Sequence, residues 1–213
     1  MAEETTTTTL IRTKLHRFPI PEGHVHRPRL LERLEQNRQR PLTLVSAPAG
    51  YGKSTLVSSW LQGCACPNAW VSLDQNDNDL NLFLNYFLAA IQTMFPDAAS
   101  ETMTLVDTPT LPPLSILATS LVNELDLIEQ DFILVLDDIL LIREESVFNL
   151  LTELLRHPPR SMHLVVIGRR KSANILWVRP SWIAFAVPYA KQCTHWALTR
   201  RHGKSVGGIL LPG

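Results

Sequence analysis

Four uninterrupted apolar segments alternate with segments of helical periodicity along the middle of the chain. The apolar segments have the length of strands and show no alternation of apolar and polar positions; they are residues 42–46, 69–73, 132–136 and 163–167. Apolar residues three and four positions apart predict helices between them, at 53–61, 80–94, 114–128 and 144–156, with a shorter one after Pro28. Strands that are apolar throughout are typical of a parallel sheet covered on both faces. The pattern therefore predicts a three-layer α/β/α fold with a mainly parallel sheet.

The segment from Phe95 to Pro113 contains four prolines and many polar residues, and we expect it to be a long loop. Residues 1–12 begin with a polar, acidic run that includes five consecutive threonines, and this composition predicts disorder. The run has no basic start and no apolar core, so it does not resemble a secretory signal. No window reaches the apolar length of a membrane span. We therefore expect a soluble, cytoplasmic protein without a membrane span.

Charge divides the chain into a folded body, 13–170, and a tail, 171–213. All 20 acidic residues precede Lys171, whereas six of the 20 basic residues and three of the five tryptophans lie in the tail. Three interpretations of the tail are open: an out-of-frame translation product, which we favour; a divergent real segment with an edge strand at 183–187; or a basic, aromatic membrane-surface element. The net charge of the whole chain is zero, which by itself favours neither nucleic acid nor a charged membrane surface.

A glycine-containing loop lies between the first apolar strand and the following helix. Its residues are Ala47, Pro48, Ala49, Gly50, Tyr51, Gly52, Lys53, Ser54 and Thr55. Glycines allow the backbone to curl so that N–H groups point at phosphate oxygens, and the helix N-terminus adds positive charge. Lys53 can then reach the β- and γ-phosphates, and the Ser54 hydroxyl can hold Mg²⁺. The alternative, a glycine-rich turn that happens to precede a lysine, is disfavoured by the strand before it and the helix after it.

Two carboxylates, Asp137 and Asp138, end the strand at 132–136. In a phosphate-loop enzyme Asp137 would face the metal held by Ser54, and Asp138 would polarise the attacking water. The alternative is that the two aspartates only form a turn after a buried strand.

Arg169 follows the next strand. It could contact the γ-phosphate, or it could be a solvent-exposed basic residue at the strand end. Arg27 lies upstream of the loop. Two roles are equally plausible for it: contact with the nucleotide base or ribose, and a surface salt bridge.

These residues together resemble the N-terminal ATPase domain of MalT-like transcriptional regulators of the LuxR class, which are signal-transduction ATPases with numerous domains (STAND). The resemblance covers residues 13–170 and includes 13–15, 25–30, 47–55, 70–79, 136–138 and 164–169. It implies a phosphate-loop fold of the ASCE type that binds ATP or ADP with Mg²⁺. It also implies a switch that is ADP-bound at rest and oligomerises with ATP. The sequence departs from the family at Ile139-Leu140 and after Arg169.

The resemblance gives the leading functional hypothesis, an ATP-binding and slowly hydrolysing regulatory domain without the family's sensor repeats or helix-turn-helix. We expect nucleotide as its ligand, self-association or association with full-length relatives, and no direct contact with DNA. A stand-alone phosphate-loop kinase or nucleotidase is one alternative, although the loop at 96–113 carries no arginines for an acceptor. A non-enzymatic interaction fragment is another.

The sequence Cys64-Ala65-Cys66 lacks the spacing of a zinc site, and we expect reduced thiols there.

Overall fold

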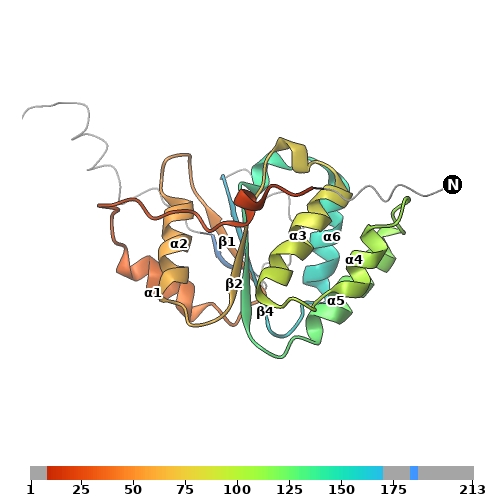
Figure 1. Ribbon diagram of the computed structural model, residues 1–213. Coiled ribbons are helices and arrows are strands. Elements are labelled where there is room, and N and C mark those ends of the chain that lie inside the picture. The colour runs from red at the N-terminus through yellow and green to blue at the C-terminus, as the bar shows by residue number, and fades with distance from the viewer. Residues whose placement is uncertain (1–8, 170–182, 187–213) are drawn as a thin grey trace, which may run out of the picture.

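A five-stranded parallel sheet forms the centre of the molecule (Figure 1). The computed structural model describes residues 9–169 and the backbone of 183–186. The strands lie in the order β2-β3-β4-β1-β5, and all neighbouring pairs are parallel. They are β1 (Leu42–Ser46), β2 (Asn68–Ser72), β3 (Phe132–Asp137), β4 (Met162–Gly168) and β5 (Ile183–Ala186). The predicted parallel sheet is confirmed.

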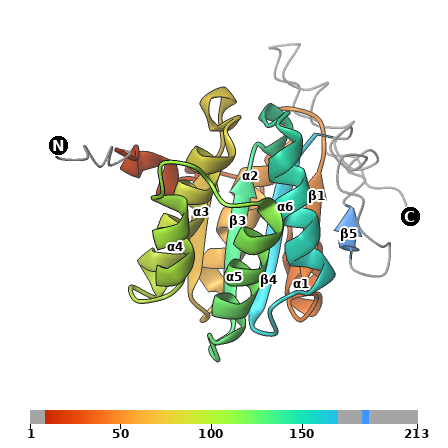
Figure 2. The ribbon, with the colours of Figure 1, turned by 90° about the vertical axis from the view of Figure 1, so that its right-hand side faces the viewer.

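Helices cover both faces of the sheet, as Figures 1 and 2 show. The helices α1 (Pro28–Gln36) and α2 (Lys53–Gly63) lie on one face. The other face carries α3 (Leu80–Met94), α4 (Ser100–Val106), α5 (Leu114–Asp126) and α6 (Glu145–Arg156). The fold is therefore the three-layer α/β/α arrangement that the sequence predicts.

The strands β1 to β4 are mainly apolar because each contributes side chains to two separate cores. In β3, Leu134 and Leu136 belong to the larger core under α3–α6, whereas Ile133 and Val135 belong to the smaller core under α1 and α2. Successive side chains of a strand point to opposite faces, so a sheet covered on both sides needs apolar residues at every position. All six residues of β3 are buried, including Asp137 at its end.

The prediction of a continuous loop from Phe95 to Pro113 is wrong, because α4 lies within it. Three groups of this helix, the N–H groups of Glu101 and Thr102 and the Thr102 hydroxyl, donate hydrogen bonds to the Glu124 carboxylate of α5. Glu124 thereby satisfies donors that a helix leaves open in its first turn. Seven residues are too few to show helical periodicity in the sequence, and α4 is stabilised by this contact with α5.

The segment before α1 begins at the edge of the sheet that β2 forms, and it packs beside β2 there. It contains the short 3-10 helix η1 (Arg12–Leu15), and Leu10 and Leu15 pack against the larger core. Of residues 1–12, for which the sequence predicts disorder, 1–8 lie outside the described residues, whereas Leu10 packs against the larger core and the Ile11 N–H donates a hydrogen bond to the Tyr86 hydroxyl. Most of the tail also lies outside the described residues. The strand β5 lies beside β1, where the second interpretation of the tail expects an edge strand. The origin of residues 171–213 stays a prediction.

Candidate nucleotide-binding site

The loop between β1 and α2 has the backbone shape of an anion cradle. Gly50 and Gly52 have φ angles of 78° and 69°, in the left-handed region that side chains with a Cβ rarely adopt. A Cβ on Gly52 would also lie 3.4 Å from the Arg27 guanidinium. Gly52 is the N-cap of α2, so the helix starts at Lys53 and presents its first-turn N–H groups to the loop. The loop and the helix dipole together favour an anion such as phosphate at this position.

Lys53 extends back over the loop. Its ammonium donates a hydrogen bond to the Pro48 carbonyl at 3.2 Å. This contact keeps the positive charge beside the cradle. A polyphosphate chain in the cradle would replace the weak carbonyl contact by charge-assisted hydrogen bonds.

Asp137 lies at the end of β3 and faces α2. The residue is 5% exposed, its carboxylate lies beside Ser54, and it accepts a hydrogen bond from the Asp138 backbone N–H at 2.9 Å. Burial, reinforced by the negative charge of Asp138, raises the pKa of Asp137 to about 6, although the Ser54 hydrogen bond and Lys53 act in the opposite direction. The positive charge of Lys53 therefore does not offset the burial of this carboxylate. A divalent cation held between Ser54 and Asp137 would supply more positive charge, so these residues fit a Mg²⁺ site.

Asp138 differs from Asp137 in both conformation and exposure. Its φ angle is 58°, which turns the chain sharply after β3, and its side chain is exposed. Non-glycine residues in this region are uncommon and cost about 1–3 kcal/mol, a strain that is typical of functional sites. The two adjacent carboxylates therefore have different environments: one is buried against Ser54 and the other is open to water.

Arg169 follows β4 directly and is exposed. The strand end beside it is joined to the loop, because the Ala47 N–H donates a hydrogen bond to the Gly168 carbonyl at 3.4 Å. The register of the sheet also pairs Ser46 with Gly168. The sheet thus brings the ends of β1 and β4 together, with Arg169 one residue beyond the pair.

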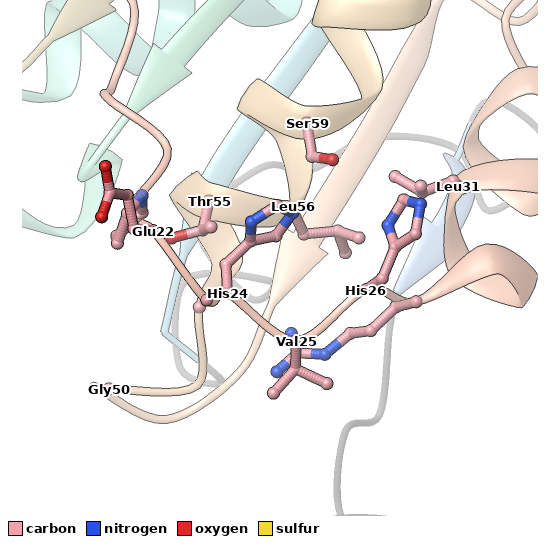
Figure 3. Close-up of a pocket in the computed structure, with 13 residues that line it drawn as sticks. Glu22, His24, Val25, His26, Leu31, Gly50, Thr55, Leu56 and Ser59 are labelled. Atoms are coloured by element: carbon pink, nitrogen blue, oxygen red, sulfur yellow. The ribbon is translucent and has the colours of Figure 1, made fainter.

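A cavity of about 220 Å³ lies between the segment before α1 and the first turns of α2 (Figure 3). Arg27 lines it, and its guanidinium donates a hydrogen bond to the Tyr51 carbonyl at 3.1 Å. The remaining lining residues are Pro21, Glu22, Gly23, His24, Val25, His26, Leu31, Gly50, Gly52, Thr55, Leu56 and Ser59. Drug-sized ligands need about 300–1,000 Å³. The cavity is therefore large enough for a flat ring system next to the cradle, but not for a whole nucleotide.

His24 and His26 were not predicted as site residues. Figure 3 shows the His24 ring directed towards the first turn of α2 and the His26 ring directed towards Leu31. The two rings form an edge-to-face pair with centroids 5.9 Å apart. The Nε2 atom of His24 is buried and has no hydrogen-bond partner among the described residues. Only their place directly before Arg27 in the sequence could have indicated them.

Residues 28–167 match the model of the family described as the AAA ATPase domain. The chain belongs to this AAA ATPase domain family. Among the described residues, no helix of this ATPase domain is long and apolar enough to cross a membrane. The family implies nucleotide binding, typically with Mg²⁺.

The AAA ATPase domain is similar to the N-terminal region of transcriptional regulators. It is 34% identical over 193 residues to the HTH-type transcriptional regulator MalT of Klebsiella pneumoniae, which is 86% of this chain and 21% of that regulator. Against MalT of Serratia proteamaculans it is 36% identical over 160 residues, 75% of this chain and 18% of the other. The chain thus spans about a fifth of the length of these curated relatives. The family resemblance inferred from the sequence is confirmed.

One similar solved structure is a STAND protein with a tetratricopeptide repeat sensor from Pyrococcus horikoshii. It has 20% sequence identity and a TM-score of 0.49, and the match covers 75% of this chain and 22% of that chain.

Proposed function

We propose that this AAA ATPase domain is the ATP- and ADP-binding switch of a MalT-like regulator of the LuxR class. The observation that carries the proposal is the contact between Ser54 and Asp137 at the mouth of the glycine-containing loop. It joins the first turn of α2 to the end of β3, two elements that lie about 80 residues apart in the chain. A metal-nucleotide site needs this pairing of a hydroxyl and a carboxylate beside a phosphate cradle.

In the proposed site the backbone from Ala47 to Thr55 holds the phosphates and Lys53 neutralises their charge. Ser54 and Asp137 hold Mg²⁺, which when bound withdraws charge from the phosphate oxygens. The exposed carboxylate of Asp138 orients and polarises the attacking water, which supports slow hydrolysis of ATP to ADP and phosphate. Arg169 contacts the γ-phosphate from the end of β4. The base occupies the cavity beside Arg27.

The regulatory role is proposed from the similarity to MalT. In this role ADP maintains a resting state, and ATP favours self-association or association with full-length relatives in the cytoplasm. We assign nucleotide binding, and no DNA contact, to residues 13–170, which match about a fifth of the length of these regulators. Residues 171–213 form a separate basic tail in this proposal.

The proposal is tested by the variant Lys53→Ala and a fluorescent ATP analogue. We expect the dissociation constant for Mg-ATP to rise about 10- to 100-fold, since the variant loses charge-assisted hydrogen bonds worth about 1.5–3 kcal/mol. Arg156→Ala is the matched control, because Arg156 is exposed on α6 and pairs only locally with Glu153. Equal affinity of Lys53→Ala and the unsubstituted chain would overturn the assignment of the cradle.

A further inference from the structure

Two thiols lie in contact at the opposite end of α2 from the nucleotide cradle. The Cys64 and Cys66 sulfur atoms are 2.8 Å apart, and both residues are partly accessible. Cys64 is the C-cap of α2, and Cys66 lies in the turn before β2. The turn is held on both sides: the Cys64 N–H donates to the Leu61 carbonyl, and the Asn68 amide donates to the Cys66 carbonyl. The sulfur atoms are within about 1 Å of the covalent S–S distance.

The surroundings give the two thiols different roles. The Arg38 guanidinium lies 3.7 Å from the Cys64 sulfur. The Glu35 carboxylate lies 3.5 Å from Arg38 and also interacts with this guanidinium, but it is half exposed, so water weakens its interaction with Arg38. Burial, together with the contact with Cys64, raises the pKa of Cys66 to about 12. We therefore assign the first attack to Cys64, the thiol in contact with the guanidinium, and the second to Cys66.

A hollow of about 20 Å³, the size of about one water molecule, lies beside Cys66, so a disulfide approaches the thiols from outside it and meets the charges along its wall. Arg38 and Arg160 line it, opposed by one carboxylate, Asp131. Ser161 and His163 add polar groups to the same wall. Arg38 is shared with Glu35, so Arg160 is the guanidinium on this wall that an approaching anionic disulfide can contact.

We propose that Cys64 and Cys66 are a redox-active dithiol that exchanges with small anionic disulfides of the glutathione class. The Cys64 thiolate attacks one sulfur of the disulfide, which forms a mixed disulfide and releases one thiolate that takes up a proton from water. Cys66 then loses its proton and attacks the Cys64 sulfur, which releases the second thiol. The protein gives up two electrons and two protons, and the small disulfide is reduced to two thiols.

The test uses the full chain with Cys193→Ser, so that only the pair remains. The protein is equilibrated with oxidised and reduced glutathione, quenched with an alkylating agent and weighed by mass spectrometry. We expect a species that has lost two hydrogens and takes up no alkyl groups. In the Cys66→Ser variant we expect one glutathione to stay attached, because the second step is blocked. Protein that takes up two alkyl groups at every ratio of oxidised to reduced glutathione would overturn the proposal.

A second measurement separates the contact with Arg160 from general thiol reactivity. The rate of oxidation is compared for glutathione disulfide and for the uncharged hydroxyethyl disulfide, in the same Cys193→Ser protein and with Arg160→Gln added. We expect Arg160→Gln to slow the reaction of glutathione disulfide about 3- to 10-fold and to leave that of hydroxyethyl disulfide unchanged. Equal slowing of both disulfides would contradict the contact between Arg160 and an anionic partner.

Discussion

At the scale of single residues, Asp137 shows how position changes chemistry. An aspartate on the surface is charged at every physiological pH, whereas Asp137 is buried at the end of β3 and its pKa is raised from 3.8 to about 6. Asp138 is adjacent in sequence but exposed, in a left-handed backbone conformation. The two residues are therefore suited to different tasks, one to holding a cation and the other to contacting water.

The raised pKa of Asp137 predicts a pH-dependent stability of the nucleotide-free protein. The folded state binds the proton more tightly than the unfolded chain does, so this residue lowers the free energy of unfolding as the pH rises from about 4 through about 6. We expect Asp137→Asn to remove this slope and to stabilise the nucleotide-free protein at pH 7.5 by about 1–3 kcal/mol. Urea denaturation at several pH values measures both effects.

The same variant provides its own control in the presence of ligand. Since Asp137→Asn cannot give a charged ligand to Mg²⁺, it should weaken Mg-ATP binding while it stabilises the free protein. A variant that keeps the pH slope of the unsubstituted chain would show that the slope arises from other groups.

At the scale of elements, Lys14 joins η1 to the turn after β2. Its ammonium lies 2.7 Å from an Asp77 oxygen, 2.9 Å from an Asp74 oxygen and 4.6 Å from the centre of the Tyr86 ring. The Asp77 side chain is fully buried, and it also accepts a hydrogen bond from the Asp74 N–H. Tyr86 belongs to α3, and its hydroxyl accepts from the Ile11 N–H. One lysine thus connects the start of the chain to β2, η2 (Gln75–Asp77) and α3.

We expect Lys14→Met to destabilise the protein by about 3 kcal/mol, because it leaves the buried Asp77 carboxylate without its cation. The free energy of unfolding in urea is the measurement. Arg156→Met is the control: this pair with Glu153 is largely exposed, with side-chain exposures of 56% and 37%, so its loss should cost less than about 1 kcal/mol. Similar losses for the two variants would mean that the Lys14 contact is no stronger than a surface ion pair.

At the scale of the whole molecule, the candidate site is assembled from four separate parts of the chain, one of which is the end of β4 with Arg169. The segment before α1 forms one wall of the cavity, the loop before α2 forms the cradle, and the end of β3 supplies the carboxylates. The parallel sheet brings the last two together, since it places the carboxyl ends of its strands at one edge. The cavity adds a place for the base that no single element provides.

This arrangement predicts that His24 contributes to base recognition. Its Nε2 atom is buried without a partner among the described residues, so a base edge that bonds to it would satisfy an unpaired group. We expect His24→Ala to raise the dissociation constant for ATP about 3- to 10-fold and to leave that for inorganic tripolyphosphate unchanged, as measured by calorimetry. His16→Ala, at an exposed position outside the cavity, is the control. Equal weakening of both ligands would place His24 in a structural role instead.

The sequence by itself determined the features that depend on local pattern. Continuous apolar strands predicted the parallel sheet, and the spacing of Gly50, Gly52, Lys53 and Ser54 predicted the cradle. The position of Asp137 at a strand end predicted that it would face α2, because parallel strands end at the same edge of a sheet. The prediction of the sheet is confirmed because it rests on a rule that holds for any sheet of this type, whereas the roles of the loop residues and Asp137 stay predictions.

Only the tertiary structure decided the features that depend on contacts between distant residues. The helix α4 forms where a loop was predicted, since Glu124 of α5 caps its first turn. Lys14 and Asp77 lie 63 residues apart, and nothing in either local sequence indicates that they pair. His24 is placed beside the cradle by the path of the chain over α2. Such contacts depend on which helices and strands pack against each other, and the short-range pattern of apolar and polar residues does not contain this information.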